Sequence, residues 1–462
     1  MYRLFYFLLF SLFIVHNSFG QSEKFKIGEV INQVPVNNSS DTFSLYLPTK
    51  FNSNQLSSIV FVFDPGGNGN HGINVFVEAA EEYNYILVCS NATRNGRPYD
   101  ENFKAANILF KTIFSTFTID EKQMYAAGFS GGSRLASSIA ALTNKFQAVI
   151  ACGAGLTVNQ SYKPKDGMFS FIGLVGDQDM NYQEMLNTKQ SLDKVKVTNE
   201  LITYEGKHRW PPKEQILRAF EWLELQAYRK KIRIFNRNNV NSFYQKPYHI
   251  ADSLHKNKLY IRALSEFNHL QNSFHYFLNT DSIQKKIKLL ESSNDYKKQH
   301  TNHLNYLSLE NKLFEKFSTV YKREVLNGTS SDNFVWWKKE LDLLNQMILK
   351  SKSIGEKRAY ERLKFSLHAG MYESSVTYVI SKNFKQALYC DQLSVLLKPN
   401  NGYFHYRLAV SHARNNNFTK MIASLKKSKE LKFQRFQQVE KTPEFKKYKQ
   451  RRKFLKLFKE YK

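Results

Sequence analysis

The chain has 462 residues, which exceeds one ordinary domain and predicts two or three. Hydrophobic residues make up 42% and aromatic residues 15% of the sequence, which excludes a wholly disordered chain. The net charge of +27 falls almost entirely on residues 231–462, which hold 45 Lys and Arg against 19 Asp and Glu, and this asymmetry predicts a domain boundary near residue 230.

The N-terminus predicts export. Arg3 supplies a positive charge, residues 4–15 form an apolar run, and Ser18 to Gly20 provide the small residues that a signal peptidase reads. The run is shorter than the roughly 20 residues that cross a bilayer, so we interpret residues 1–20 as a signal peptide. The alternative is an uncleaved anchor. We expect the mature protein in the periplasm or outside the cell.

Residues 21–230 alternate short apolar runs with helical patterns. Strands are predicted over 58–63, 85–89, 123–128, 147–152, 169–175 and 201–204. Helices are predicted near 73–83, 101–117, 132–143, 181–194 and 212–230. This alternation is typical of an α/β fold, with a mainly parallel sheet and helices on both of its faces. Residues 25–47 alternate in the manner of antiparallel edge strands, and we expect them to begin the sheet.

The three cysteines are Cys89, Cys152 and Cys390. An odd and sparse set predicts no disulfide framework, and no Cys/His cluster has the spacing of a metal site. Cys89 and Cys152 lie within predicted strands, so we interpret them as buried hydrophobic residues rather than reactive thiols. No metal or other cofactor is expected.

The second half of the chain, residues 231–462, predicts a helical domain with an internal repeat. Gly and Pro are rare there, and a spacing of 34 residues relates Ala387 to Met421. With Pro399 after a predicted helix, the pattern resembles TPR repeats, whose helix pairs stack on one another to bury their apolar faces. A third unit is predicted over 243–277. Residues 280–360 are helical without fitting the period, and the alternative is an irregular helical domain.

The segment Gly128-Phe129-Ser130-Gly131-Gly132 matches the pattern G-x-S-x-G. It follows a predicted strand and opens a predicted helix, which is the context in which this motif forms a tight turn and presents the serine hydroxyl above the sheet. Larger side chains would clash in that turn, which explains the glycines. The alternative role for Ser130 is that of a helix N-cap.

Two later segments supply the partners that a nucleophilic serine needs. A base must take the hydroxyl proton and a carboxylate must orient that base, and after this motif the acid precedes the histidine along the chain. Asp177 and Asp179 end one predicted strand and His208 ends the next, at the sheet edge where α/β folds place their sites. We favour Asp179 over Asp177 as the acid, and a catalytic His208 over a surface histidine.

The oxyanion of an acyl-transfer intermediate needs two N–H donors. Gly131, directly after the nucleophile, is expected to supply one of them. The other is expected from the loop after residue 63, where Pro65 cannot donate and Gly66 or Gly67 can. The alternative is that this loop is a plain glycine-rich turn.

On these motifs the first 230 residues resemble the α/β-hydrolase superfamily, in the branch of feruloyl-esterase-like, polyhydroxybutyrate-depolymerase-like and dienelactone-hydrolase-like proteins. The motifs are Gly-Phe-Ser-Gly-Gly at 128–132, Gly-Asp-Gln-Asp-Met-Asn-Tyr at 176–182 and Gly-Lys-His-Arg-Trp at 206–210. The resemblance implies Ser130 as nucleophile, Asp179 as acid and His208 as base. Many relatives have His-Gly before the oxyanion glycines, whereas this chain has Asp64-Pro65, a departure that bears on the oxyanion geometry.

The resemblance implies a serine hydrolase that cleaves a carboxylic ester through an acyl-enzyme on Ser130. Peptides and thioesters are alternative substrates. The helical half is expected to recruit or position a substrate, a peptide or a protein partner. The competing hypothesis is a non-catalytic binding scaffold of the cell envelope.

The basic excess of the helical half has two interpretations. It is either the solvated surface of charged helices or a contact surface for acidic glycans, anionic lipids or an acidic protein. Nucleic acid is not an expected partner, because an exported protein meets little of it.

Overall fold

The computed structural model describes residues 25–327 and 331–458. The predicted signal peptide, residues 1–20, lies outside the described residues. In the part of the chain that the structure describes, no helix has the length and apolar character needed to cross a membrane.

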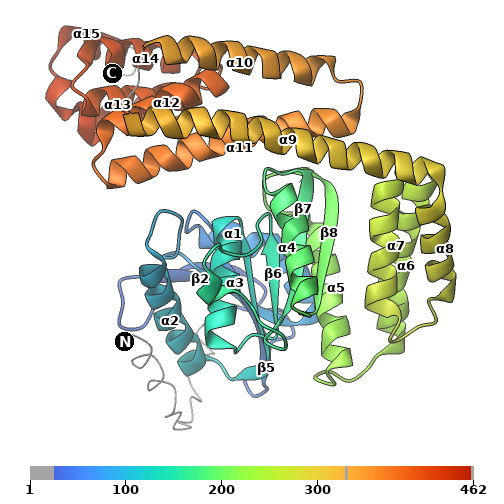
Figure 1. The fold of residues 1–462 in the computed structure, drawn as a ribbon. Coiled ribbons are helices and arrows are strands. Elements are labelled where there is room, and N and C mark those ends of the chain that lie inside the picture. Colours follow the sequence, from blue (N-terminus) through green and yellow to red (C-terminus); the bar gives the residue numbers. More distant parts are fainter. Residues whose placement is uncertain (1–24, 328–330, 459–462) are drawn as a thin grey trace.

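One eight-stranded sheet forms the first part of the molecule (Figure 1), in the order β1-β2-β4-β3-β5-β6-β7-β8. Its strands are β1 Val30–Pro35, β2 Thr42–Tyr46, β3 Ser57–Phe63, β4 Tyr85–Ser90, β5 Ile119–Phe129, β6 Ala148–Cys152, β7 Ser170–Gln178 and β8 Asn199–Lys207. Strands β3 to β8 pair in parallel, and β2 pairs antiparallel with both β1 and β4. The mainly parallel sheet with antiparallel leading strands confirms the predicted α/β-hydrolase fold of this part.

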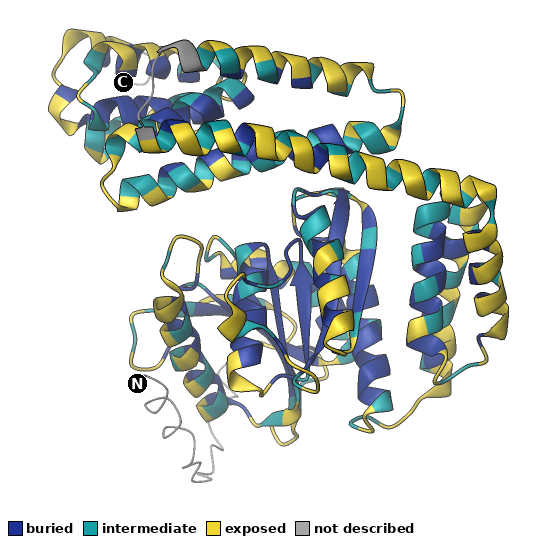
Figure 2. Cartoon of the chain, viewed as in Figure 1, coloured by how far each residue is buried: buried dark blue, intermediate teal, exposed yellow. Residues whose placement is uncertain are grey.

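Helices cover both faces of the sheet: α1 Gly69–Tyr83, α2 Tyr99–Thr116, α3 Gly131–Thr143, α4 Tyr182–Lys194 and α5 Lys213–Arg229. Alternate residues of a strand face opposite sides. Phe61 and Phe63 therefore pack with α2 and α3, whereas Val60 and Val62 pack with α1 and α5. Figure 2 shows the strands buried and the outer helix surfaces exposed. Burial on both faces explains why the central strands are continuous apolar runs.

The strands β5, β7 and β8 extend beyond their predicted limits. The extensions are rich in polar residues, so the predicted apolar runs end before the strands do. The extension of β7 to Gln178 places Asp177 within the strand and Asp179 in the turn that follows it. Cys89 and Cys152 are buried and unpaired in β4 and β6, as predicted.

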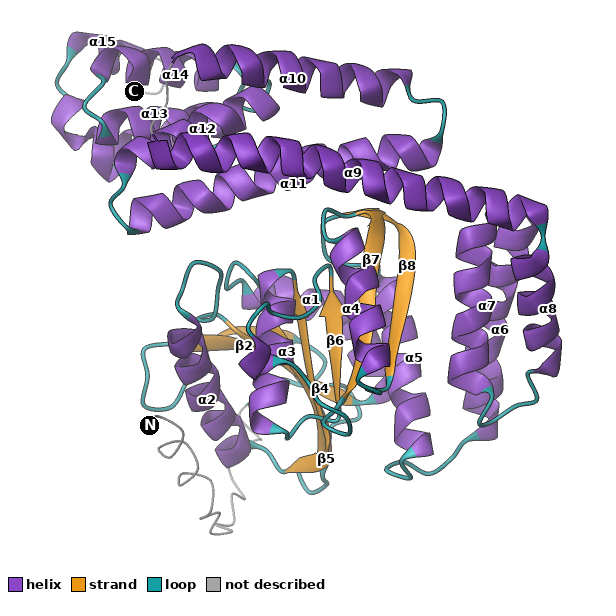
Figure 3. Ribbon diagram, viewed as in Figure 1, coloured by secondary structure: helices purple, strands orange, loops and turns teal. Residues whose placement is uncertain are grey.

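The remainder of the chain is helical (Figure 3). Its α-helices are α6 Arg237–Lys256, α7 Tyr260–Phe274, α8 Asp281–Ser292, α9 Asn294–Asn327, α10 Ser331–Lys350, α11 Ile354–Ile380, α12 Phe384–Leu397, α13 Gly402–Arg414, α14 Phe418–Glu430 and α15 Arg452–Phe458. Short 3₁₀ helices span Gln160–Tyr162 in the sheet region and Phe436–Lys441 and Pro443–Tyr448 near the end. The helix-rich second part confirms the predicted fold class.

The 34-residue spacing coincides with equivalent places in two helices. Ala387 in the first turn of α12 and Met421 in the first turn of α14 are both fully buried. Ala251 in α6 and Ala263 in the neighbouring α7 are equally buried. The TPR resemblance and the domain limits at residues 20 and 230 stay predictions.

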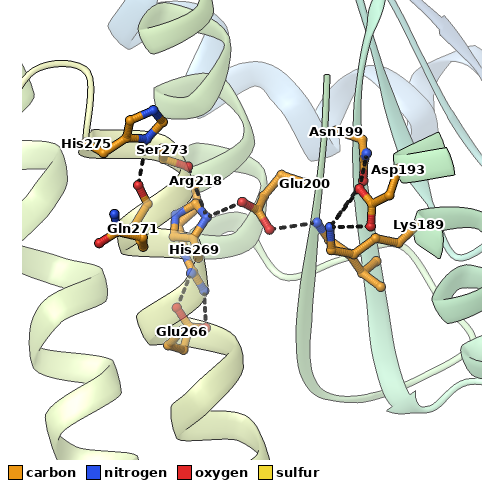
Figure 4. Close-up of polar contacts among 11 residues, drawn as sticks. Lys189, Asp193, Asn199, Glu200, Arg218, Glu266, His269, Gln271, Ser273 and His275 are labelled. Carbon is orange, nitrogen blue, oxygen red and sulfur yellow. Dashed lines mark hydrogen bonds and ion pairs between the residues drawn. The ribbon is translucent and has the colours of Figure 1, made fainter. Parts of the chain in front are cut away.

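The helical part docks against the sheet through buried charges as well as apolar contacts. Arg218 of α5 and Glu266 of α7 form a two-pronged ion pair, with Nη1–Oε1 and Nη2–Oε2 distances of 3.1 and 2.6 Å. His269 of α7 lies with its Nδ1 3.3 Å from Oε2 of Glu200 on β8. Figure 4 shows both pairs side by side at the junction of α5, α7 and β8. These contacts fix α7 against the last strand of the sheet.

Removing one partner of the Arg218–Glu266 pair should destabilise the protein strongly. We expect Arg218→Met to cost about 3–5 kcal/mol, because it leaves the Glu266 carboxylate buried without a counter-charge. The double variant Arg218→Met/Glu266→Leu should regain most of this loss. Urea denaturation measures both, with Lys427→Met as control, since the exposed Lys427–Glu430 pair is worth at most about 1 kcal/mol. Equal urea midpoints for Arg218→Met and Lys427→Met would contradict the role of the buried pair.

Two buried histidines should make the helical part sensitive to acid. Burial, aided by nearby lysines, lowers the pKa of His368 and of His412 to about 4. Among the described residues, Nε2 of His368 and Nδ1 of His412 have no hydrogen-bond partner. Between the unfolded pKa of about 6.5 and the folded pKa of about 4, the unfolded chain binds more protons, so stability falls as the pH falls through this window.

This pH dependence should weaken when the two rings are replaced. We expect the urea midpoint of the wild type to drop from pH 7 to pH 4.5, and the His368→Gln/His412→Gln variant to show a flatter profile over the same range. The comparison concerns slopes, so a lower starting stability of the variant does not affect it. An unchanged slope would show that other groups dominate acid unfolding.

Candidate active site

Ser130 occupies a strained turn between β5 and α3. Its backbone angles are φ 52° and ψ −121°, a conformation that residues other than glycine rarely adopt and that costs on the order of 1–3 kcal/mol. The Ser130 N–H donates to the Cys152 carbonyl at 2.8 Å, which holds the turn against the neighbouring strand. This is the strand–turn–helix geometry expected for a G-x-S-x-G nucleophile.

The flanking glycines permit the close approach that this turn needs. A Cβ atom on Gly128 would lie 2.7 Å from the Ser133 nitrogen and would overlap the Gly132 carbonyl. A Cβ atom on Gly132 would overlap the Phe63 carbonyl oxygen and lie 2.7 Å from its carbon. Because these contacts involve backbone, no side-chain adjustment relieves them. The two glycines therefore let α3 start directly above β3 and β5.

The structure brings Ser130, His208 and Asp179 together from three separate strand ends. His208 Nε2 lies 3.0 Å from Ser130 Oγ, and His208 Nδ1 lies 2.8 Å from Asp179 Oδ1. Ser130 is 6% and Asp179 1% exposed, so water screens their interactions little. The three side chains form one hydrogen-bonded line in which a proton can pass from the hydroxyl to the imidazole while the carboxylate fixes the ring.

Asp179, and not the alternative Asp177, contacts the histidine. The Asn181 N–H donates to Asp179 Oδ1 at 2.8 Å, and the Asn181 side chain donates to the Gly153 carbonyl at 2.7 Å, which fixes the turn. Asp177 instead forms an ion pair with Arg358 of α11. Burial raises the pKa of Asp177, and the Arg358 guanidinium opposes that shift.

The predicted oxyanion donors are only partly in place. The Gly66 N–H donates to Asp64 Oδ1 at 2.8 Å and the Gly67 N–H to the Asp64 carbonyl at 3.1 Å, so both are already engaged. The assignment of Gly66 or Gly67 as the second oxyanion donor stays a prediction, and such a donor would have to exchange its contact with Asp64 for the oxyanion. Gly131 is the first residue of α3, and its N–H belongs to the helix end whose donors have no intrahelical acceptor.

Asp64 is the cause of this arrangement. Its buried carboxylate accepts hydrogen bonds from Gly66 and Asn68 through Oδ1 and from the Trp210 indole through Oδ2 at 3.2 Å. Trp210 lies two residues after His208. The Asp64 carboxylate thus closes its own loop and ties it to the segment that carries His208.

Sequence reasoning missed residues that only the tertiary structure brings to the site. The Asn95 side-chain amide lies against Gly131, so that a Cβ atom at position 131 would overlap it. The backbone N–H of Asn95 donates to the Pro65 carbonyl at 2.9 Å. The sole sequence signal for Asn95 was its place after a strand in the same sheet. Phe365 of α11 lies with its ring centroid 5.9 Å from that of His208, and nothing in the sequence connects it with the histidine.

Other chemistry at the site is limited by burial. Burial raises the pKa of the Cys89 and Cys152 thiols well above the ordinary value, which opposes formation of a reactive thiolate. Within the described ranges, no group of three or more His, Cys, Asp or Glu side chains is arranged to hold a metal ion.

No family model and no curated protein matches the chain. Solved structures do resemble it over the sheet region. One is the fluorophosphonate-binding serine hydrolase F of Staphylococcus aureus, with 15% identity over 42% of this chain and 97% of that one and a TM-score of 0.35. A second is esterase 2 of Thermogutta terrifontis, with 14% identity, 43% and 93% coverage and a TM-score of 0.35.

A third is a putative dienelactone hydrolase of Klebsiella pneumoniae, with 16% identity, 43% and 98% coverage and a TM-score of 0.35. In each case less than half of the present chain aligns with nearly the whole length of the solved protein. The helical part of the chain has no counterpart in these alignments.

Two glycine-to-alanine variants should shift stability in opposite directions. Gly132→Ala should destabilise the protein by about 1–3 kcal/mol, because its methyl group meets the β3 backbone. Gly370→Ala, in the middle of α11, has no atom within 4 Å of the new methyl group and should stabilise it by up to about 1 kcal/mol. Differential scanning calorimetry measures the Tm of both variants. If both shift the Tm in the same direction, the tight turn at Gly132 is contradicted.

Proposed function

We propose that the chain is a serine hydrolase that acts through a covalent acyl-enzyme. The observation that carries the proposal is the line Ser130–His208–Asp179, with its 3.0 and 2.8 Å contacts and the strained backbone of Ser130. A structural serine needs neither a histidine base nor a positive φ. The combination is that of an activated nucleophile.

The geometry supports a two-step mechanism. Ser130 Oγ attacks the substrate carbonyl while its proton passes to His208 Nε2, and Asp179 stabilises the imidazolium through Nδ1–H. The oxyanion forms near the N-terminus of α3, where the Gly131 N–H and the helix dipole favour negative charge. His208 then gives the proton to the leaving group as the carbonyl–heteroatom bond breaks. Water, deprotonated by His208, releases the acyl group from Ser130.

The finer assignment is a carboxylic ester hydrolase of the cell envelope or the exterior. The ester class is supported by the motifs shared with feruloyl-esterase-like and dienelactone-hydrolase-like proteins. Export is supported by the predicted signal peptide, residues 1–20. We also propose that the helical half contacts a protein, a peptide or an acidic surface, on the strength of its helix pairs and its basic excess.

A second candidate function is a binding scaffold that has lost hydrolysis. One observation favours it: the Gly66 and Gly67 N–H groups donate to Asp64 and so leave one oxyanion donor unassigned. An oxyanion hole with one donor missing typically loses a factor of about 10²–10³ in kcat. The preserved contacts of all three proposed catalytic side chains favour the enzyme.

A fluorophosphonate probe separates the two candidates. We expect it to label the purified wild type and not the Ser130→Ala variant, because only an activated hydroxyl displaces fluoride from phosphorus. On p-nitrophenyl acetate, Asp179→Asn should lower kcat by a factor on the order of 10⁴, since the histidine loses its orienting carboxylate.

Asp177→Asn is the matched control, because it changes a neighbouring buried carboxylate that does not touch His208. It should reduce hydrolysis far less than Asp179→Asn. Absence of labelling in a folded wild type would refute the enzyme and leave the scaffold.

A further inference from the structure

Helix α11 crosses the carboxyl edge of the sheet above the proposed active site. In Figure 1, α9 and α11 extend over the end of the sheet at which β7 terminates. Contacts with the sheet region occur at residues 358, 362, 365, 376 and 380, which recur at the spacing of one helix face. At 1.5 Å per residue these positions span roughly 33 Å. One face of α11 therefore runs from Asp177 past His208 to the loop at Gly96.

At one end, two arginines anchor α11 to the strand that presents the triad acid. Arg362 is buried and its Nη1 donates to the Asp177 carbonyl at 2.8 Å. Its orientation is fixed by Glu310 of α9, which accepts from Nε at 3.1 and 3.2 Å. Arg358 pairs with the Asp177 carboxylate. A planar, always-charged guanidinium with bidentate contacts is a rigid attachment, so this part of α11 is not free to swing away.

At the other end, α11 reaches the nucleophile side of the site. A Cβ atom on Gly96 would lie 3.8 Å from both Val376 and Ile380, which places this loop in van der Waals range of the helix. The preceding Asn95 lies against Gly131. The helix thus borders both the acid and the nucleophile sides.

Phe365 lies between these ends and faces His208. Its ring is half-buried, and among the described residues it belongs to none of the hydrophobic clusters that hold the helical part together. Its ring centroid is 5.9 Å from that of His208, whose other aromatic neighbour, Phe129, lies at 4.7 Å. A partly exposed aromatic residue with no role in a core is available for a ligand.

We propose that Phe365 is a specificity-determining residue that selects an aromatic alcohol portion of the substrate, an inference that rests on the proposed ester hydrolysis. The reason is positional. His208 Nε2 must reach the leaving alcohol oxygen to protonate it as the acyl C–O bond breaks, so the alcohol lies on the His208 side of Ser130. The ring beside His208 therefore meets the alcohol, whereas the acyl group stays on Ser130.

The test compares benzyl acetate with cyclohexylmethyl acetate, whose acyl groups are identical and whose alcohols are similar in size. The wild type should favour the benzyl ester in kcat/KM, and Phe365→Leu should lower that preference about two- to tenfold, the fold-change expected of a ring–ring contact. Phe365→Trp should retain the preference. The ratio of ethyl butyrate to ethyl acetate, which reports the acyl side, should not change in any variant.

Phe314→Leu, an exposed phenylalanine of α9, is the matched control and should behave as the wild type. Fluorophosphonate labelling of Ser130 in Phe365→Leu separates this inference from the proposed function. If Ser130 labels normally, three results would overturn the role of Phe365 alone. They are a benzyl preference that Phe365→Leu leaves unchanged, a shift of the acyl ratio as large as that of the alcohol preference, and a wild type that hydrolyses none of the esters. A wild type that does not label would overturn the proposed function and this inference with it.

Discussion

The parallel alignment of β5, β7 and β8 within one sheet is the constraint on which the site depends. Parallel strands end at the same edge of a sheet, so the turns after them meet although they are far apart in the chain. Ser130, Asp179 and His208 each follow one of these strands closely, and their side chains meet at 3.0 and 2.8 Å. The strain at Ser130 is sustained because β3 and β6 hold the turn from both sides.

Two buried ion pairs position helices of the second half of the chain. Arg218 of α5 pairs with Glu266 of α7, and Arg362 of α11 pairs with Glu310 of α9, each through two or more hydrogen bonds. Buried pairs of this kind add little net stability, since desolvation offsets the attraction, but a broken pair is costly. Their effect is to specify how the helices sit. The first pair fixes α7 beside α5. The second fixes α11 beside α9, and Arg362 also donates to the Asp177 carbonyl of β7. The remaining lysines and arginines are mostly exposed.

Asp64 determines the hydrogen bonding of the glycine-rich loop after β3. Glycines at 66 and 67 suit an oxyanion loop, yet a carboxylate two residues before them is the strongest acceptor within reach. The carboxylate accepts from the Gly66 N–H and from the Trp210 indole, while the Gly67 N–H donates to the Asp64 backbone carbonyl, so the loop is linked to the His208 segment. Asp64 thus joins this loop and the His208 segment in one hydrogen-bond network.

The sequence by itself determined the class of the fold and most strand and helix positions of the sheet region, and it indicated Ser130 and His208 for the proposed triad. It could do so because buried parallel strands are continuous apolar runs and because the glycines around Ser130 reflect a local steric need. It left Asp177 and Asp179 as alternatives, since both follow the same strand. Only the tertiary structure decided between them, by extending β7 through Asp177 and pairing that residue with Arg358.

The engaged state of Gly66 and Gly67 and the position of Phe365 were also decided by the tertiary structure alone. Phe365 lies more than 150 residues after His208 in the chain, and its approach depends on how α9 and α11 are anchored. Local patterns encode which face of a helix is apolar, but not which partner that face will meet. That choice is made by the summed contacts of distant segments, which no single stretch of sequence contains.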